Sequence, residues 1–456
     1  MSTAELQQLR SKLAFPQSLI TDNSLAETYS HDETDYRIRP SAVLIAEDRD
    51  DVVTAVRFCL THNIPITARG AGTGLSGGCV PSKGALVLST EKLDFMRLFP
   101  QDRVAICGPG VITKDLQDEA AKFNLTYPPD PASYAESTLG GNVAENAGGL
   151  RCKRFGVTKD YVIGLEAVTG KGELVTTGIL SDTQGFSFGD VFIASEGTLA
   201  IVTSIAARLI PLPARGYTIL AAFESPGDAA RTVSEINASG MILTVMEFLD
   251  GDTVALVNEY AGTNEIQKAA GVLLMETSDR DVESQSREIN LICRRNRASF
   301  LRTESDPETA ESLWELRRNV SNAARDSSKV KVSEDIAVPN SKFPALVEFV
   351  AHMNQSSPLR INSYGHAGDG NLHVNFLSAT GSAEDMQLIR TGINALLRQA
   401  IALGGTLTGE HGIGIAKKDF MSLEFDEPTL SAMRTFKSVF DPQNVLNPGK
   451  LFPESK

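Results

Sequence analysis

The segment from Arg69 to Gly78 constrains the fold more than any other part of the sequence, because five of its ten residues are glycine. It follows Ile64–Ala68, an apolar run that predicts a buried strand. Glycine leaves the backbone N–H groups uncovered, so such a loop can wrap a phosphate group with N–H donors. The pattern is neither a P-loop nor a G-x-G-x-x-G that opens a helix in a βαβ unit. A tight turn between two strands is the alternative interpretation.

Further motifs follow in a defined order: Tyr127–Pro131, the glycine cluster Ser137–Gly149, Phe155–Tyr161 and Ser195–Val202. Together with the first loop, these motifs resemble the FAD-binding domain of the vanillyl-alcohol oxidase / para-cresol methylhydroxylase superfamily. The resemblance covers the chain from Arg39 to Pro213. It implies an α+β fold, in which a two-subdomain FAD-binding domain of the para-cresol methylhydroxylase type is joined to an α/β cap domain with an antiparallel sheet.

The same resemblance implies where FAD is held. The loop at 70–76 is expected to bind the pyrophosphate, and the segment 137–149 is expected to line the rest of the cofactor. Thr73 stands where covalent members carry histidine, so we expect non-covalent FAD. The implied cofactor-binding residues are Arg69, Gly70, Ala71, Gly72, Thr73, Gly74, Ser76, Pro129, Ser137, Gly140, Gly141, Asn142, Asn146, Gly148, Gly149, Glu196, Gly197, Ile201 and Asn447.

Domain boundaries are expected at two points. Pro211 and Pro213 flank a change from short glycine-rich strands to alternating strand and helix patterns, beginning with Tyr217–Glu224 and Pro226–Ala238. We therefore expect an FAD-binding domain at 1–213, a substrate or cap domain at 214–406, and a C-terminal segment at 407–456. The motif Asn444–Lys450 matches the family tail that packs back on the flavin domain.

Three of the six histidines lie in two motifs near the C-terminus. Gly368, Asp369 and Gly370 can turn the chain between two strands, so His366 and His373 would face each other across the turn. His373 and Asn375 alternate along a strand and share a face. Two imidazoles and one carboxylate suit a divalent ion, and Glu410 and His411 supply a carboxylate and a nearby base. The alternative is a set of hydrogen-bonded core histidines.

The motifs G-H-x-G-D-G-N-L-H and G-E-H-G-I-G resemble those of the C-terminal FAD-linked oxidase domain, from about Ala214 to Phe452. That domain occurs in D-lactate, glycolate and D-2-hydroxyglutarate dehydrogenases. The resemblance implies that His366, His373 and Glu410 are metal ligands. It also implies that Asn375 contacts the substrate and that His411 is the base.

Arg317 follows W-x-L, where relatives bind the substrate carboxylate. A solvated helix charge is the alternative for this arginine. Ser321 stands where D-2-hydroxyglutarate dehydrogenases carry threonine, and neither Lys329 nor Lys331 matches their downstream lysine cleanly.

The function expected from these resemblances is FAD-dependent oxidation of glycolate or D-lactate to the 2-oxo acid. Hydride would pass from C2 to flavin N5, with help from a divalent metal. Zinc is the first choice, and iron or manganese also suits the ligands. The segment Gly140–Gly149 is most similar to the flavin subunit of glycolate dehydrogenases. The alternatives are a D-2-hydroxyglutarate dehydrogenase, a non-catalytic FAD-carrying subunit and a metal-dependent hydrolase, although the chain has no H-E-x-x-H helix.

The net charge and the cysteine content limit which binding partners and electron acceptors are expected. A formal net charge of −14 argues against nucleic-acid binding, which needs clustered cations. The five scattered cysteines include no C-x-x-C pair, so no iron–sulfur cluster is expected and electrons must leave through an acceptor protein, a quinone or an iron–sulfur subunit. The sequence shows no signal peptide and no apolar run of about 18 residues. We expect a cytoplasmic protein that can also associate peripherally with the inner face of a membrane.

Overall fold

The computed structural model describes residues 1–22, 26–180, 188–266, 269–278 and 281–453. The chain divides into two compact units. Unit 1 comprises Met1–Gly148, Gly156–Leu212 and Glu410–Lys456, and unit 2 comprises Gly149–Phe155 and Pro213–Gly409. Both units combine helices with sheets, and the antiparallel sheet expected after Pro213 is present in unit 2.

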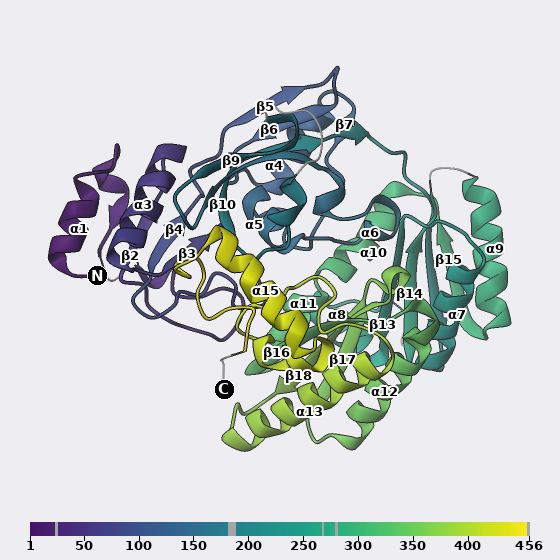
Figure 1. The fold of residues 1–456 in the computed structure, drawn as a ribbon. Helices are drawn as coiled ribbons and strands as arrows, with labels where there is room; N and C mark the ends of the chain where they lie inside the picture. The colour runs from purple at the N-terminus through teal and green to yellow at the C-terminus, as the bar shows by residue number, and fades with distance from the viewer. Residues whose placement is uncertain (23–25, 181–187, 267–268, 279–280, 454–456) are drawn as a thin grey trace. The chain divides into compact units, whose positions relative to one another are not determined.

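Unit 1 contains a four-stranded sheet, a five-stranded sheet and a short pair of strands, and Figure 1 shows their strands. In the first, β2, β4 and β3 run parallel and β1 is antiparallel to β2; the strands are β1 (Leu19–Ile20), β2 (Ala42–Ile45), β3 (Ile66–Arg69) and β4 (Leu86–Ser89). The second is antiparallel with the order β5-β6-β10-β8-β9; its strands are β5 (Met96–Phe99), β6 (Val104–Cys107), β8 (Val162–Thr169), β9 (Leu174–Thr176) and β10 (Ala200–Arg208). A short pair joins β7 (Leu125–Thr126) to β11 (Ile210–Pro211).

Helix α3 (Arg49–His62) connects the cores of the two sheets. Its apolar residues recur at helical spacing, and Val52, Val56 and Cys59 pack in one cluster with residues from both sheets. Asp48 caps its first turn by accepting a hydrogen bond from the Asp51 N–H at 2.8 Å. The other helices of unit 1 are α1 (Thr3–Arg10), α4 (Thr113–Ala121), α5 (Leu139–Glu145), α14 (Met421–Glu424) and α15 (Glu427–Phe440).

A buried ion pair at the end of α15, between Lys437 and Asp441, holds the C-terminal segment in place within unit 1. Asp441 accepts a hydrogen bond from Lys437 Nζ at 2.6 Å and from the N–H groups of Val445 and Leu446 at 2.9 Å each. Lys437 also donates to the Thr198 carbonyl at 2.8 Å. Burial lowers the pKa of Lys437, and Asp441 partly opposes that shift. This pair therefore fixes the turn that leads the chain back beside β3.

Unit 2 is built on one seven-stranded antiparallel sheet with the order β15-β12-β14-β13-β17-β18-β16. The strands are β12 (Thr218–Phe223), β13 (Val245–Asp250), β14 (Gly271–Glu276), β15 (Ala298–Glu304), β16 (Val330–Ala337), β17 (Arg360–Gly365) and β18 (Asn371–Ser378). Three of these strands coincide closely with the apolar runs in the sequence, because the central strands are buried on both faces.

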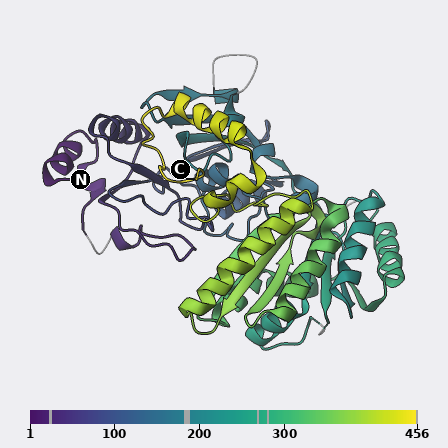
Figure 2. The ribbon, with the colours of Figure 1, turned by 60° about the horizontal axis from the view of Figure 1, so that its bottom comes forward.

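Helices cover both faces of this sheet (Figures 1 and 2). One core cluster joins Leu249, Tyr364 and Leu377 to three helices: α8 (Gly251–Ala261), α10 (Pro307–Arg318) and α11 (Val320–Asp326). The other helices are α7 (Pro226–Ala238), α9 (Val282–Arg295), α12 (Phe343–Ser356) and α13 (Ala383–Ala402). Among them, α12 packs on α7 and α13, and α13 contacts β16 and β18.

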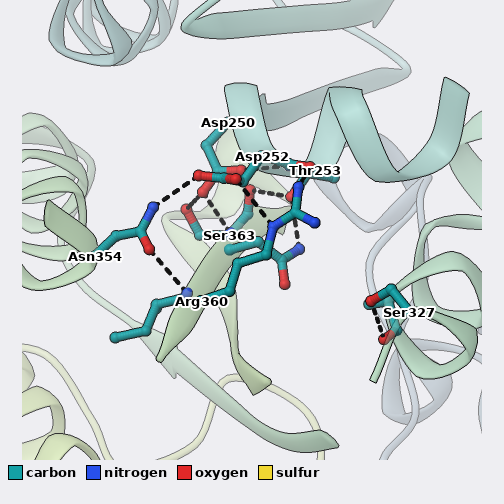
Figure 3. Close-up of polar contacts among 10 residues, drawn as sticks. Asp250, Asp252, Thr253, Ser327, Asn354, Arg360 and Ser363 are labelled. Carbon is teal, nitrogen blue, oxygen red and sulfur yellow. Dashed lines mark hydrogen bonds and ion pairs between the residues drawn. The ribbon is translucent and has the colours of Figure 1, made fainter. Parts of the chain in front are cut away.

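Asp250 joins the end of β13 to the start of α8. It caps α8 by accepting from the Thr253 N–H at 2.8 Å, and it also accepts from the Ser363 N–H at 2.5 Å and hydroxyl at 2.8 Å (Figure 3). Asp252 similarly accepts from Asn354 and Arg360. These carboxylates fix α8 against β17.

The segment Gly149–Phe155 groups with unit 2, although it lies within the range that we assigned to the FAD domain from sequence. Its helix α6 (Cys152–Phe155) contacts β13, and Arg154 donates to the Thr244 hydroxyl at 3.1 Å. Within the residues described, no helix is both long and apolar enough to cross a bilayer.

The Asp441→Ala substitution should destabilise the protein by about 3–5 kcal/mol, because it leaves the buried Lys437 ammonium without its counterion. Urea unfolding, monitored by far-ultraviolet circular dichroism, measures this loss of stability. Glu427→Ala is the matched control on the same helix, because Glu427 is 76% exposed in its ion pair with Arg434, and it should change stability by less than about 1 kcal/mol. Equal effects of the two substitutions would contradict the structural role of the Lys437–Asp441 pair.

Candidate active site

A cleft lies within unit 1 and is lined by the glycine-rich segments. Eight of the residues expected to bind the cofactor line it: Arg69, Gly70, Gly140, Gly141, Glu196, Gly197, Ile201 and Asn447. The other lining residues are Ala68, Gly78, Cys79, Thr90, Pro109, Ala144, Glu145, Phe192, Ser195, Ala200 and Val202.

Two of the glycines permit close approach of backbone segments around this cleft. A Cβ on Gly70 would lie 2.3 Å from the Thr138 hydroxyl oxygen, and a Cβ on Gly140 would lie 2.5 Å from Pro109 Cβ. Thr138 caps α5 by accepting a hydrogen bond from the Gly141 N–H at 3.3 Å. The loop after β3 and the start of α5 can therefore lie side by side only because these positions lack a side chain.

The Arg69 guanidinium lies beneath the glycine loop. It donates to the His31 carbonyl at 2.5 Å, lies 3.3 Å from Cys79 Sγ and lies over the Tyr29 ring at 5.6 Å. Its Nη2 occupies the space that a Cβ on Gly72 would need. Arg69 thus packs against the glycine loop and holds the N-terminal segment around His31 beside it.

Several of the other predicted cofactor residues support the backbone. The Asn142 amide donates to the Thr113 hydroxyl at 2.7 Å, and Asn146 ends α5 in the left-handed region and accepts from the Lys159 N–H at 2.9 Å. The Pro129 carbonyl accepts from Gln117, and the Ser137 carbonyl accepts from Thr113. The remaining predicted residues do not line the cleft: Ala71, Gly72, Thr73, Gly74, Ser76, Gly148 and Gly149.

The Glu196 carboxylate holds the loop that follows Glu410 and His411. Its two oxygens accept from the N–H groups of Ile413 and Gly414, each at 2.7 Å. Glu196 also adopts a positive φ of 50°, as does its neighbour Ala194 at 60°. The Asn447 amide donates to the Glu196 carbonyl at 2.6 Å, which connects the C-terminal tail to the same point.

Glu145 and Lys450 are buried beside this loop. Burial and the neighbouring Glu196 raise the pKa of Glu145 well above its usual range, and one of its oxygens has no hydrogen-bond partner among the described residues. Burial lowers the pKa of Lys450 to about 8, and its Nζ donates to the Gly78 carbonyl. Sequence reasoning did not single out Glu145 as chemically distinct, although it is the one ionisable residue within the glycine-rich stretch 137–149.

In unit 2, a tight turn brings His366 and His373 together as predicted. The residues Ala367–Asp369 form a single 3₁₀ turn, and Gly370 continues it with a φ of 75°. The register pairs Tyr364 with His373, so His366 directly follows the end of β17 and His373 lies near the start of the neighbouring strand β18. Their ring centroids lie 5.4 Å apart with perpendicular planes.

A buried carboxylate from β13 lies beside this pair. Glu247 is fully buried, and its Oε1 is 2.6 Å from His366 Nδ1. Its Oε2 accepts from Arg317 at 2.8 Å from Nε and 2.5 Å from Nη2. Burial alone would raise the pKa of Glu247, but the charges of Arg317 and His366 outweigh it and hold the pKa at about 2. Sequence reasoning missed Glu247, although a carboxylate flanked by apolar residues within the buried part of a strand requires a partner.

Asn375 lies on the same face of the sheet, two residues after His373. It is completely buried, yet neither atom of its amide has a hydrogen-bond partner among the described residues. Leaving such groups unpaired costs about 1–3 kcal/mol each. The position is therefore suited to a bound polar ligand.

Glu410 follows directly on Gly409, the last residue of unit 2. Asp335 holds the last residues of unit 2. Its Oδ2 accepts a hydrogen bond from the Gly409 N–H at 2.7 Å, and its Oδ1 accepts one from the Thr408 hydroxyl at 3.1 Å. The predicted ligand set draws His366 and His373 from unit 2 and Glu410 from unit 1. Two imidazoles and a carboxylate are a donor set that suits one divalent ion.

Comparison with known proteins supplies the family. Residues 212–451 match the family described as FAD linked oxidases, C-terminal domain, and residues 40–178 match the FAD binding domain. The chain belongs to the family of FAD-linked oxidases. The resemblance carried by the glycine and histidine motifs is confirmed, and the protein is an FAD-linked oxidoreductase.

Two curated relatives illustrate the range of named activities. A Bacillus subtilis (strain 168) protein named glycolate oxidase subunit GlcD is 36% identical over 462 residues, covering 99% of this chain and 97% of its own. A D-lactate dehydrogenase of Archaeoglobus fulgidus is 33% identical over 434 residues, covering 93% and 96%.

The solved structure of p-cresol methylhydroxylase with substrate bound has a TM-score of 0.81 with 15% identity, covering 99% of this chain and 97% of its own. This similarity confirms the expected fold type.

The Glu196→Ala substitution should loosen the loop at 410–414, because the N–H groups of Ile413 and Gly414 lose their acceptor at about 1–3 kcal/mol each. Hydrogen–deuterium exchange of peptides covering 409–417 should become faster by at least tenfold. Glu119→Ala, in an exposed pair on α4, is the control and should leave these peptides unchanged. Unchanged exchange in the Glu196 variant would show that the loop is held by other contacts.

Proposed function

We propose that this FAD-linked oxidoreductase oxidises a small 2-hydroxy acid, glycolate or D-lactate, to the 2-oxo acid. The observation that carries the proposal is the buried face of unit 2, where His366 and His373 lie beside an amide, that of Asn375, with no partner among the described residues. An FAD-carrying chain without catalysis would not need this arrangement. The names of the relatives support the substrate class.

His366, His373 and Glu410 would hold one divalent ion, with zinc the first choice and iron or manganese also suited to two imidazoles and a carboxylate. When bound, the metal supplies Lewis acidity to the 2-hydroxyl group of the substrate. FAD would be bound non-covalently, because Thr73 stands where covalent members carry the histidine that bonds the flavin. When bound, FAD supplies the two-electron acceptor.

The residues of the chain then bind and orient the substrate. Arg317 is 5% exposed and gives two of its five N–H donors to Glu247, so its other donors would hold the substrate carboxylate. The Asn375 amide would contact the substrate oxygens. His411 would take the hydroxyl proton while C2 gives up a hydride to FAD, so the C2–O single bond becomes a carbonyl.

A second candidate substrate is D-2-hydroxyglutarate, which carries a distal carboxylate. Lys331 lies on the same face as Asn375, because Ser333, two residues on, pairs with Asn375 across the sheet. Its Nζ donates to the Ser321 hydroxyl at 2.7 Å. A cation at this place favours a diacid, so Lys331→Met should weaken turnover of D-2-hydroxyglutarate but not of glycolate if the diacid is the substrate.

Reoxidation of the flavin would require an external acceptor. The five cysteines are free thiols, and three of them, Cys59, Cys107 and Cys293, are buried. We infer that electrons pass to a partner protein, an iron–sulfur subunit or a quinone. A cytoplasmic protein that binds peripherally at the inner face of a membrane suits a quinone acceptor.

Anaerobic addition of glycolate, D-lactate, L-lactate and D-2-hydroxyglutarate, each to a separate sample, tests the proposal. The visible flavin absorption should bleach with glycolate or D-lactate and should persist with L-lactate. Trichloroacetic acid precipitation should leave the FAD in the supernatant. A flavin that none of the acids reduces, in metal-replete protein, would contradict the proposed reaction.

The His411→Ala substitution should slow flavin reduction by about 10²–10⁴-fold, the usual contribution of a general base. Stopped-flow absorbance gives the rate, and the FAD content confirms that the cofactor still binds. His352→Ala, at an exposed position on α12, is the control and should reduce its flavin at the wild-type rate. Wild-type reduction in the His411 variant would exclude this histidine as the base.

A further inference from the structure

Glu247 lies at the centre of unit 2, and neither the family motifs nor the roles assigned above account for it. It is the one carboxylate among the apolar side chains Val245, Met246, Phe248 and Leu249 of β13, and none of its surface is exposed. A carboxylate in such a place costs several kcal/mol unless cations or N–H donors surround it. Its two oxygens show which groups these are.

Each oxygen of Glu247 has its own partner. Oε1 is 2.6 Å from Nδ1 of His366, and Oε2 accepts a hydrogen bond from Nε of Arg317 and forms an ion pair with its Nη2. The antiparallel register of β13 against β17 pairs Phe248 with Gly365. The adjoining residues, Glu247 on β13 and His366 after β17, therefore lie opposite each other. The contact is therefore imposed by the sheet and does not depend on a flexible loop.

Arg317 extends the same network to the second histidine. Its guanidinium lies 4.9 Å above the Tyr364 ring, and that ring lies 5.3 Å from the ring of His373. Arg317 and Tyr364 are both buried. One cation thus neutralises the carboxylate behind His366 and packs on the aromatic ring beside His373.

We propose that Glu247 is a positioning residue that holds His366 with its hydrogen on Nδ1 and its lone pair on Nε2, ready to bind a divalent ion. The inference rests on the metal site of the proposed function. A carboxylate bonded to the far nitrogen of a ligating histidine fixes the tautomer and ring orientation and makes the imidazole a better donor. Arg317 keeps that carboxylate ionised and in place, in addition to any contact with substrate.

The test is metal affinity, measured without turnover. The FAD-loaded protein is stripped of metal with a chelator, and Zn²⁺ is titrated back in competition with a chromogenic chelator. The Glu247→Gln variant should bind Zn²⁺ about 10–100-fold more weakly, since a single amide oxygen cannot accept from both His366 and Arg317. The flavin spectrum of the variant reports whether it is folded.

Asp250→Asn is the matched control, because Asp250 is a half-buried carboxylate on the same strand that contacts Thr253 and Ser363 and not a histidine (Figure 3). It should bind Zn²⁺ within about twofold of wild type, since asparagine also caps a helix. Wild-type affinity in the Glu247→Gln variant would overturn the positioning role while the metal site itself stands. A wild-type protein that binds no divalent ion would instead overturn the proposed metal site, and the inference with it.

A second measurement keeps the inference testable if Glu247→Gln does not fold. In ¹⁵N-histidine-labelled wild-type protein loaded with Zn²⁺, the His366 signals are identified by their loss in His366→Gln. Nδ1 should show the shift of a protonated nitrogen and Nε2 that of a metal-bound nitrogen. Zinc on Nδ1 of His366 would overturn the proposal.

Discussion

The buried carboxylate of Glu247 and the charges that surround it organise unit 2. An isolated carboxylate would be too costly in the apolar interior, so the sheet must bring a cation and an imidazole to it. Arg317 comes from α10 and His366 from the end of β17, and both reach Glu247 within hydrogen-bond distance. The helix cluster over this face packs around that network. The ring of His366, one of the candidate metal ligands, is thus held by a buried charge.

A different constraint shapes unit 1, where backbone groups have to lie close together. Gly70 and Gly140 let two loops approach the helix start at Thr138 without a steric clash. Glu196 then links this cleft to the C-terminal loop by accepting two backbone N–H bonds. A loop that carries a candidate base is thereby held by a rigid carboxylate, which is what proton transfer in a fixed geometry requires.

Local patterns in the sequence predicted the parts of the site that local structure determines. The Gly368–Gly370 turn and strand alternation were sufficient to bring His366 towards His373, because neither depends on distant residues. Contacts between distant segments could not be predicted: Arg69 holds the carbonyl of His31, and Glu247 meets Arg317 from 70 residues away. An acidic residue flanked by apolar residues within a strand was the available signal for Glu247.

Single-turnover reduction of the bound flavin, in metal-free protein and again after one equivalent of Zn²⁺ or Mn²⁺ is restored, tests most directly whether the histidine–carboxylate cluster and FAD serve one reaction. The substrate that bleaches the flavin is mixed anaerobically in a stopped-flow instrument. Restoring metal should raise the reduction rate by about a hundredfold, equivalent to about 2.7 kcal/mol of transition-state stabilisation. Reduction at the same rate with and without metal would contradict a metal-assisted oxidation.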